Sequence, residues 1–334
     1  MGDSEYIDQC LNLISRTPEQ LATDLIFRPR QSWAVDFSPL RQFPIIRLKK
    51  DRFVCPDLQL LEYYFDDALY WAVVGSYATE SGIQQLYGEL FEQHINNVIE
   101  AFANPSPLLA KRFLPQPKFE GTQHQVSDAA FDWTQVLVLA EYKATRLTRY
   151  QKYSGDTDAL LRGFDDAFAK EKPGKAKGVG QLARSIKKIL DGAKIPGASP
   201  IGDRSLLPIL IITEPGLTNE LFRRRLDDKL RDALEESIRP RVLPLVLLSH
   251  FDLEAFETYV GETSAEEILR SYAISLKART SSLLDYFGSY VSRTHGGATP
   301  NTPIYMQTLR AEQLHKTATR FNIPDNSVDP SETS

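Results

Sequence analysis

The chain has 334 residues, of which 42% are hydrophobic and 25% are charged, so it can bury a core and is not a disordered chain. At about 150 residues per domain, this length fits two domains or one large domain with helical additions. The 44 acidic residues outnumber the 39 basic ones, which excludes a uniformly cationic surface. A polyanionic partner would therefore have to bind a local basic patch.

The sequence predicts a cytoplasmic protein without a membrane segment. The two cysteines, Cys10 and Cys55, are too few for a disulfide framework or a cysteine-rich zinc site. The N-terminal sequence MGDSEYIDQC lacks the basic-then-apolar profile of a secretion signal. The most apolar runs are far shorter than the roughly 18 residues that a membrane helix needs.

Residues 1–80 are predicted to form an accessory α+β region. Thr17-Pro18-Glu19-Gln20 has a hydroxyl cap, a proline at the first helical position and a glutamine three residues after the cap, a pattern typical of a helix start. Residues 44–56 contain two β-prone runs around a charged turn, which indicates a hairpin, and Asp57 should cap a helix that runs to about residue 74.

Residues 81–250 are predicted to form an α/β core with a mixed sheet flanked by helices. Apolar residues recur every three or four positions from Ile83 and predict a helix that ends at Asn104-Pro105. The continuous apolar run of residues 135–143 is typical of a strand covered on both faces. The elements expected around it are strands at 113–119, 125–132, 206–213 and 241–249, and helices at 158–169, 179–190 and 217–237.

The rest of the chain is predicted to be a helical appendage and a tail. Ser264-Ala265-Glu266-Glu267 has the pattern of a capping box before an apolar helical face, so residues 251–321 should be helical. Residues 322–334 are polar with two prolines and are expected to be mobile.

The strand at residues 135–143 ends in charged residues. Glu141 and Lys143 fall on one face directly after a buried run, where charge costs free energy unless it is paired or holds an ion. If Trp133-Thr134 form a two-residue turn, Asp128 faces Leu139 and is a diagonal neighbour of Glu141 on the same face. A three-residue turn would reverse the faces.

Two carboxylates beside a lysine suit magnesium-dependent hydrolysis of a phosphodiester bond, because this hard cation takes oxygen ligands and bridges to the scissile phosphate. Lys143 would orient or activate water and stabilise developing charge. Glu92, in the preceding helix, is a third acid. It lies within about 20° of Ile99 on a helical wheel, at the edge of the apolar stripe, where an acid needs a partner.

These features resemble the PD-(D/E)xK nuclease superfamily, also called restriction-endonuclease-like, whose core runs helix, three strands, helix, strand. The resemblance covers about residues 81–213 and depends on Gly88-Glu89-Leu90-Phe91-Glu92, Ser127-Asp128 and Glu141-Tyr142-Lys143. Ser127 stands where the family's motif nominally has proline. The resemblance implies a restriction-endonuclease-like core that binds Mg²⁺, with Mn²⁺ as a substitute.

The resemblance also implies a role for each matching residue. Asp128 and Glu141 would bind the metal, and the backbone carbonyl of Tyr142 would complete its shell. Glu92 would contact the metal or its water, and Lys143 would be catalytic.

A basic segment lies between the expected helices. Residues 170–188 carry seven Lys and Arg residues against one Glu, with glycines that would let backbone approach phosphates. Lys172, Lys175 and Lys177 are therefore expected to contact nucleic acid, although such a run also suits a solvated loop. Gln181 occupies a position where some members of the resembling family carry a site-lining glutamine.

The sequence therefore predicts a metal-dependent nuclease that acts on DNA rather than RNA, and the family context suggests bacterial or phage-related DNA processing or defence. Cutting both strands would need a second site, supplied by a homodimer or by a protein partner bound to the N- or C-terminal region. The alternative is a nuclease-like subunit that binds a protein or nucleic acid without cutting. In the simplest reading, Glu141 and Lys143 are an exposed ion pair at a strand end.

Overall fold

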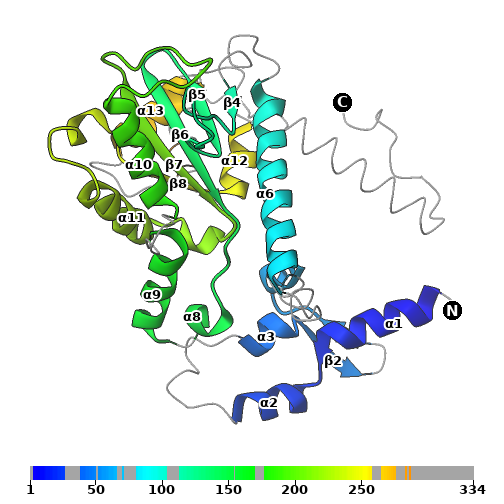
Figure 1. The fold of residues 1–334 in the computed structure, drawn as a ribbon. Coiled ribbons are helices and arrows are strands. Elements are labelled where there is room, and N and C mark those ends of the chain that lie inside the picture. The colour runs from blue at the N-terminus through cyan, green and yellow to red at the C-terminus, as the bar shows by residue number, and fades with distance from the viewer. Residues whose placement is uncertain are drawn as a thin grey trace. The chain divides into compact units, whose positions relative to one another are not determined.

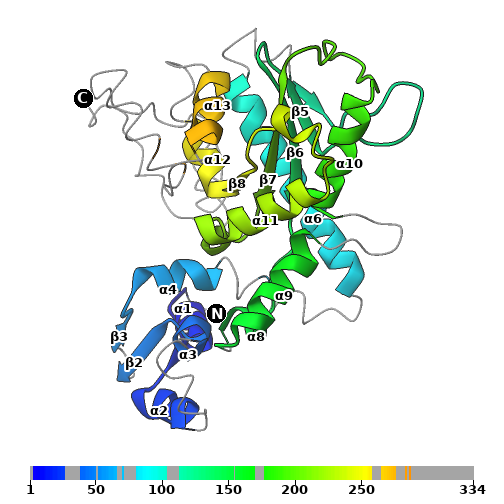
Figure 2. The same ribbon diagram turned by 90° about the vertical axis from the view of Figure 1, so that its left-hand side faces the viewer.

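The computed structural model describes residues 3–26, 38–49, 52–65, 70, 80–103, 113–153, 155–169, 177–257, 265–275, 283 and 286. The chain divides into two compact units (Figures 1 and 2). One comprises Met1–Gly88 and Leu147–Ala167, and the other comprises Glu89–Arg146 and Phe168–Ser334. The accessory unit thus takes in a later segment that the sequence assigned to the core.

The first unit is α/β, with a three-stranded sheet in the order β1-β2-β3. β1 is parallel to β2, and β2 is antiparallel to β3, which confirms the predicted hairpin. Thr17 N–H donates to Gln20 Oε1 at 2.9 Å and Gln20 N–H to Thr17 Oγ1 at 3.3 Å, so α2 starts with the predicted capping box. The elements are α1 (Asp3–Ile14), β1 (Ser15–Arg16), α2 (Pro18–Ile26), α3 (Ser38–Gln42), β2 (Ile45–Lys49), β3 (Arg52–Val54), α4 (Leu58–Tyr63), α8 (Arg149–Tyr153) and most of α9 (Thr157–Phe168).

The second unit contains a mixed five-stranded sheet in the order β4-β5-β6-β7-β8. β4, β5 and β6 are successively antiparallel, whereas β6, β7 and β8 are parallel. The predicted order of elements is confirmed, with shorter strands. Its elements are α6 (Glu80–Ala103), which crosses the boundary between the units, β4 (Phe113–Pro115), β5 (Ala129–Asp132), β6 (Val136–Lys143), α10 (Val179–Leu190), β7 (Ser205–Ile212), α11 (Glu220–Asp232), β8 (Val246–Ser249), α12 (His250–Glu257) and α13 (Ala265–Ser275).

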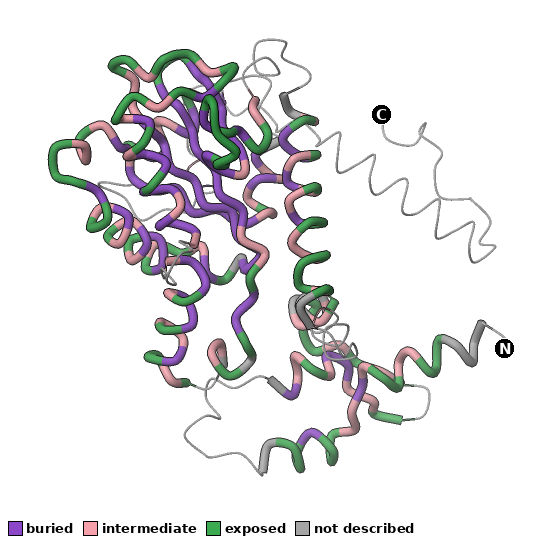
Figure 3. The backbone as a smooth tube through the Cα atoms, viewed as in Figure 1, coloured by how far each residue is buried: buried purple, intermediate pink, exposed green. Residues whose placement is uncertain are grey.

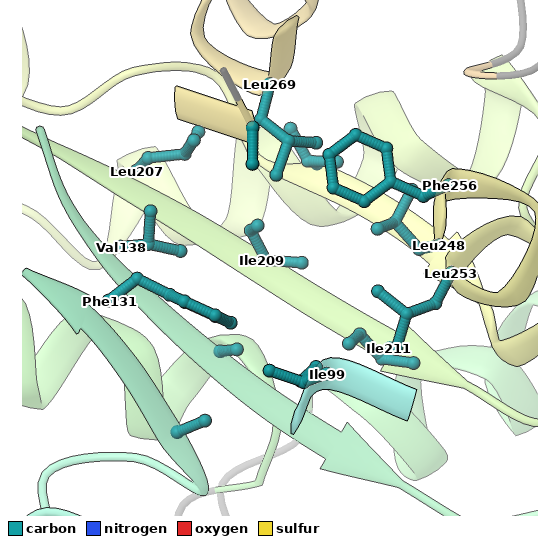
Figure 4. Close-up of a cluster of buried hydrophobic side chains, with 14 of the residues drawn as sticks. Ile99, Phe131, Val138, Leu207, Ile209, Ile211, Leu248, Leu253, Phe256 and Leu269 are labelled. Atoms are coloured by element: carbon teal, nitrogen blue, oxygen red, sulfur yellow. The ribbon is translucent and has the colours of Figure 1, made fainter. Parts of the chain in front are cut away.

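Helices cover both faces of this sheet, and its strands are buried (Figure 3). On one face, alternate residues of β5 to β8 pack in a cluster with side chains from α6, α12 and α13 (Figure 4). On the other face α10 packs on β6 and β7 through its apolar stripe, and α11 packs on α10. Each fully buried aliphatic or aromatic side chain contributes about 1.5–3 kcal/mol to this arrangement.

The helices after β8 are part of the core, which corrects the prediction of an appendage over residues 251–321. Leu253 and Phe256 of α12, and Ile268 and Leu269 of α13, belong to the buried cluster under the sheet. They cover apolar strand residues that would otherwise face water. The expected tail at residues 322–334 lies outside the described residues, as does most of the region from residue 276 onwards.

None of the helices in the described part of the chain is long and apolar enough to cross a membrane.

Gly178, directly before α10, provides a test of the packing. Its φ is 51°, and a Cβ atom there would lie 2.1 Å from the carbonyl oxygen of Phe168. Gly178→Ala should destabilise the protein by about 3 kcal/mol or more, because strain and a backbone clash add. Gly192→Ala has a φ of 97° but no neighbouring atom within 4 Å, and should cost only about 1–2 kcal/mol. Urea unfolding measures both; equal losses would contradict the clash.

Candidate active site

The charged end of β6 lies where parallel strands end. Glu141 and Lys143 occupy its last three positions with Tyr142 between them, and β7 runs parallel beside them. Tyr142 packs into the apolar cluster on the α6 side of the sheet, so its two neighbours point to the opposite face. The carboxyl ends of parallel strands are the usual place for ligand sites in open α/β sheets.

The hairpin register brings Asp128 opposite Glu141. Ala129 pairs with Ala140 and Asp132 with Leu137, so the ladder continued by one residue places Asp128 against Glu141. The turn is Thr134-Gln135, and the prediction of a turn at Trp133-Thr134 is wrong by one residue. Because this changes the register by two residues, the predicted shared face is retained, while Asp128 moves from facing Leu139 to facing Glu141.

A carboxylate distant in sequence holds this turn. Glu266 of α13 accepts hydrogen bonds from Thr134 N–H at 3.2 Å and from Gln135 N–H at 2.5 Å. In a turn at Trp133-Thr134, Gln135 would instead flank the turn and its N–H would be committed to the ladder. The contact with Glu266 therefore favours the observed turn.

A β-bulge aims the Asp128 side chain. Three steps of chain separate Pro115 from Lys118, but four separate their partners, Gln125 and Ala129, so Ser127 and Asp128 together oppose Gln116. Such bulges bend a strand and redirect a side chain. Here the Asp128 carboxylate reaches β6.

Both oxygens of this carboxylate are held by neutral donors. Tyr142 N–H donates to Asp128 Oδ2 at 2.7 Å, and Gln125 Nε2 donates to Oδ1 at 3.0 Å. The carboxylate is thus fixed from both strands of the hairpin.

Lys143 lies against both acids. Its Nζ is 2.8 Å from Glu141 Oε2 and 3.7 Å from Asp128 Oδ2, and the three side chains are 16%, 2% and 13% exposed, respectively. The reading of an exposed ion pair at a strand end is therefore wrong: this is a largely buried cluster of two acids and one base.

Burial dominates the electrostatics of the cluster. It raises the pKa of Glu141 to about 8, with a further rise from Asp128, and Lys143 only partly opposes this. Burial alone would lower the pKa of Lys143, but the carboxylates of Glu141 and Asp128 raise it above its ordinary value. Lys143 is therefore an ammonium group at neutral pH.

Glu92 joins the cluster from α6. Burial raises the pKa of Glu92, and the Asp128 carboxylate raises it further, whereas Lys143 and a hydrogen bond from the Gln116 side chain lower it. One turn later, Asn96 accepts a hydrogen bond from the Tyr142 hydroxyl at 3.2 Å, which ties α6 to β6. The sequence placed Glu92 at the edge of the apolar stripe, and it is half-buried there.

The structure brings the predicted nucleic-acid contacts together only in part. Lys172 and Lys175 lie outside the described residues, and Lys177 is half-buried before α10. Gln181 accepts a hydrogen bond from Gly178 N–H at 3.1 Å and so caps α10. Arg223, considered at first as part of a basic patch, is 5% exposed and paired with Glu220.

Sequence reasoning missed the amide side chains around the acids. Gln116 and Gln125 lie in an irregular segment before β5, and no sequence signal marks them. Asn96 had a signal, because it follows Glu92 by four residues and so shares its helix face.

The donor set fits a hard cation in chemistry. Asp128 and Glu141 offer carboxylate oxygens, and the carbonyl of Tyr142 points to the same strand edge as its N–H, toward Asp128. In the described residues no three or more His, Cys, Asp or Glu side chains are gathered closely enough to hold a metal ion. Two acids and a carbonyl are therefore the direct donors, and Glu92 acts on them through its charge.

The chain matches no family model, no curated protein and no solved structure. The geometry of the site is what supports a function.

The burial of Glu141 predicts a pH effect on stability. The folded protein keeps a proton on this carboxyl up to about pH 8, whereas the unfolded chain loses it near the ordinary value of 4.5. The free energy of unfolding should therefore fall as the pH rises through this window, on the order of a few kcal/mol. Without divalent cations, Glu141→Gln should lose less stability than the parent between pH 5 and 8.5 in urea unfolding. The exposed variant Glu120→Gln should follow the parent; parallel profiles for Glu141→Gln would contradict the assignment.

Proposed function

We propose that the chain is a divalent-cation-dependent nuclease of the PD-(D/E)xK type that hydrolyses phosphodiester bonds of DNA. The observation that carries the proposal is the convergence of Asp128, Glu141 and Lys143 at the carboxyl end of β6, with Lys143 Nζ within 3.7 Å of both acids. An acid, a second acid and a lysine held in this way match the chemistry that the sequence resemblance implies.

The topology supports the same proposal. α6, β4, β5, β6, α10 and β7 follow the family's order of helix, three strands, helix and strand. The three strands form an antiparallel meander, and β7 adds in parallel beside the strand that carries Glu141 and Lys143. Topology alone does not establish function, so the residues carry the greater weight.

The charge of the cluster supports cation binding. Glu92, Asp128 and Glu141 are three acids with Lys143 as a compensating base, and the pKa values of Glu92 and Glu141 are raised. A bound Mg²⁺ or Mn²⁺ would stabilise the negative charge that develops on a phosphate.

The residues of the chain supply the remaining chemistry. Lys143 keeps its proton at neutral pH and so donates hydrogen bonds to phosphate or water, and it is not a general base. Glu92 has a raised pKa and is half-exposed to solvent, so it suits the exchange of a proton with water near neutral pH. Asp128 is held at both oxygens and orients the site.

A cleavage assay tests the proposal. The protein should cut DNA with Mg²⁺ or Mn²⁺ but not with EDTA, and a panel of linear, circular and single-stranded DNA and RNA defines the substrate. Asp128→Asn and Lys143→Met should each lower the rate about 100-fold or more. The exposed variants Asp191→Asn and Lys194→Ala are matched charge controls and should cut as the parent does. Undiminished cleavage by both folded site variants would exclude this site.

One observation favours the alternative, a nuclease-like subunit that binds a protein or nucleic acid without cutting. The ammonium of Lys143 already lies beside both carboxylates, at 2.8 and 3.7 Å, and so offsets charge that a cation would otherwise offset. In such a subunit the ion pair is the end state.

Calorimetry with Mn²⁺ separates the two functions. A nuclease should bind the ion and release protons at pH 7.5, because the raised pKa of Glu141 must fall on binding. Lys143→Met should bind Mn²⁺ at least as tightly as the parent, since it removes a competing positive charge, although it no longer cuts. No binding heat from the folded parent, together with a stable complex with a protein partner, would favour the silent subunit.

A further inference from the structure

Gln116 has a strained backbone next to the acid cluster. Its φ is 45°, and among the residues that the structure describes it is the one non-glycine residue with positive φ. This left-handed region suits glycine, and asparagine or aspartate more often than other residues. The side chain is exposed, so packing in a core does not explain the conformation.

The two contacts of Gln116 join the elements that carry the acids. Its backbone N–H donates to the carbonyl of Asp128 at 2.9 Å, opposite the bulge. Its side chain hydrogen-bonds the carboxylate of Glu92 on α6. One residue thus links Asp128 and Glu92, which come from different elements.

The bulge by itself does not require a glutamine. Glycine would adopt the same φ without strain and would make the same backbone hydrogen bond to Asp128. What glycine would lose is the side-chain contact with Glu92. Strain that is retained at such a position indicates a use for the side chain.

The chemistry of the amide suits that use. A glutamine amide donates a hydrogen bond but carries no charge, so it can hold a carboxylate without neutralising it. A lysine or arginine at this position would hold Glu92 too, but it would also compete with a cation for the acids.

We propose that Gln116 is a positioning residue that holds Glu92 beside Asp128 so that the acids act together on a bound cation. The cation part of this inference rests on the proposed function. The contact between Gln116 and Glu92 is tested without it.

Two variants separate positioning from structure. Gln116→Gly removes the strain and the side chain, and Gln116→Asn tolerates the left-handed conformation but is one methylene too short. Both should unfold at the parent's Tm or up to about 3 °C above it. Both should raise the Mn²⁺ dissociation constant about tenfold or more, as loss of a partner that orients a ligand does. A role in folding alone would not move stability and affinity in opposite directions.

Gln123→Gly is the matched control in the same loop, and its Mn²⁺ affinity should equal the parent's. A double-mutant cycle of Gln116→Gly with Glu92→Gln adds a readout that needs no cation. The Tm change caused by Glu92→Gln should differ by at least about 2 °C between the parent and Gln116→Gly.

Each outcome decides a part of the inference. Additive Tm changes overturn the positioning role, whatever the protein binds. Unchanged Mn²⁺ affinity in Gln116→Gly overturns it as well. If the cycle shows coupling but the parent binds no Mn²⁺, the proposed cation function fails, and the cation role of Gln116 is overturned with it.

Discussion

The register of the β5–β6 hairpin places Asp128 opposite Glu141, and the rest of the site depends on it. A change of one residue would turn Glu141 and Lys143 toward the opposite face of the sheet. The register is secured at both ends. Glu266 holds the turn, Tyr142 N–H holds Asp128 at the site, and Asp132 is bound by Ser199 N–H at 2.9 Å and by Arg204. The site is therefore an outcome of backbone pairing before it is one of side-chain chemistry.

The elements around the hairpin explain how a charged cluster persists in a buried place. Helices cover both faces of the sheet, so the last residues of β6 are partly removed from water, and this burial raises the pKa of Glu141. Ser185 of α10 donates to the carbonyl of Val126 and so fixes the segment that leads to Asp128. Packing that stabilises the sheet thus creates the electrostatic tension at its edge, as is common where pKa values serve a function.

Much of this arrangement could be predicted because it follows from local patterns. The continuous apolar run of β6 and the alternation of side chains along a strand were enough to put Asp128, Glu141 and Lys143 on one face. The turn was misplaced because its partner, Glu266, is 131 positions away from Gln135. The bulge and the contacts of Gln116 and Gln125 arise from backbone pairing that leaves no residue signature. The core role of α12 and α13 depends on which sheet face lacks a cover, which periodicity does not reveal.

The acids of the second unit differ in the kind of partner that holds them. Asp132 binds the guanidinium of Arg204, and Glu220 binds Arg223; burial opposes ionisation in both, yet these partners lower both pKa values. Asp128 and Glu92 are held instead by a backbone N–H and by neutral glutamine amides, and the pKa values of Glu92 and Glu141 are raised. An arginine that satisfies an acid leaves little for a ligand to gain, whereas a neutral donor fixes a carboxylate and leaves its charge available. The same sheet thus separates structural acids from acids kept for a ligand, and the strained Gln116 lies among the partners of the second kind.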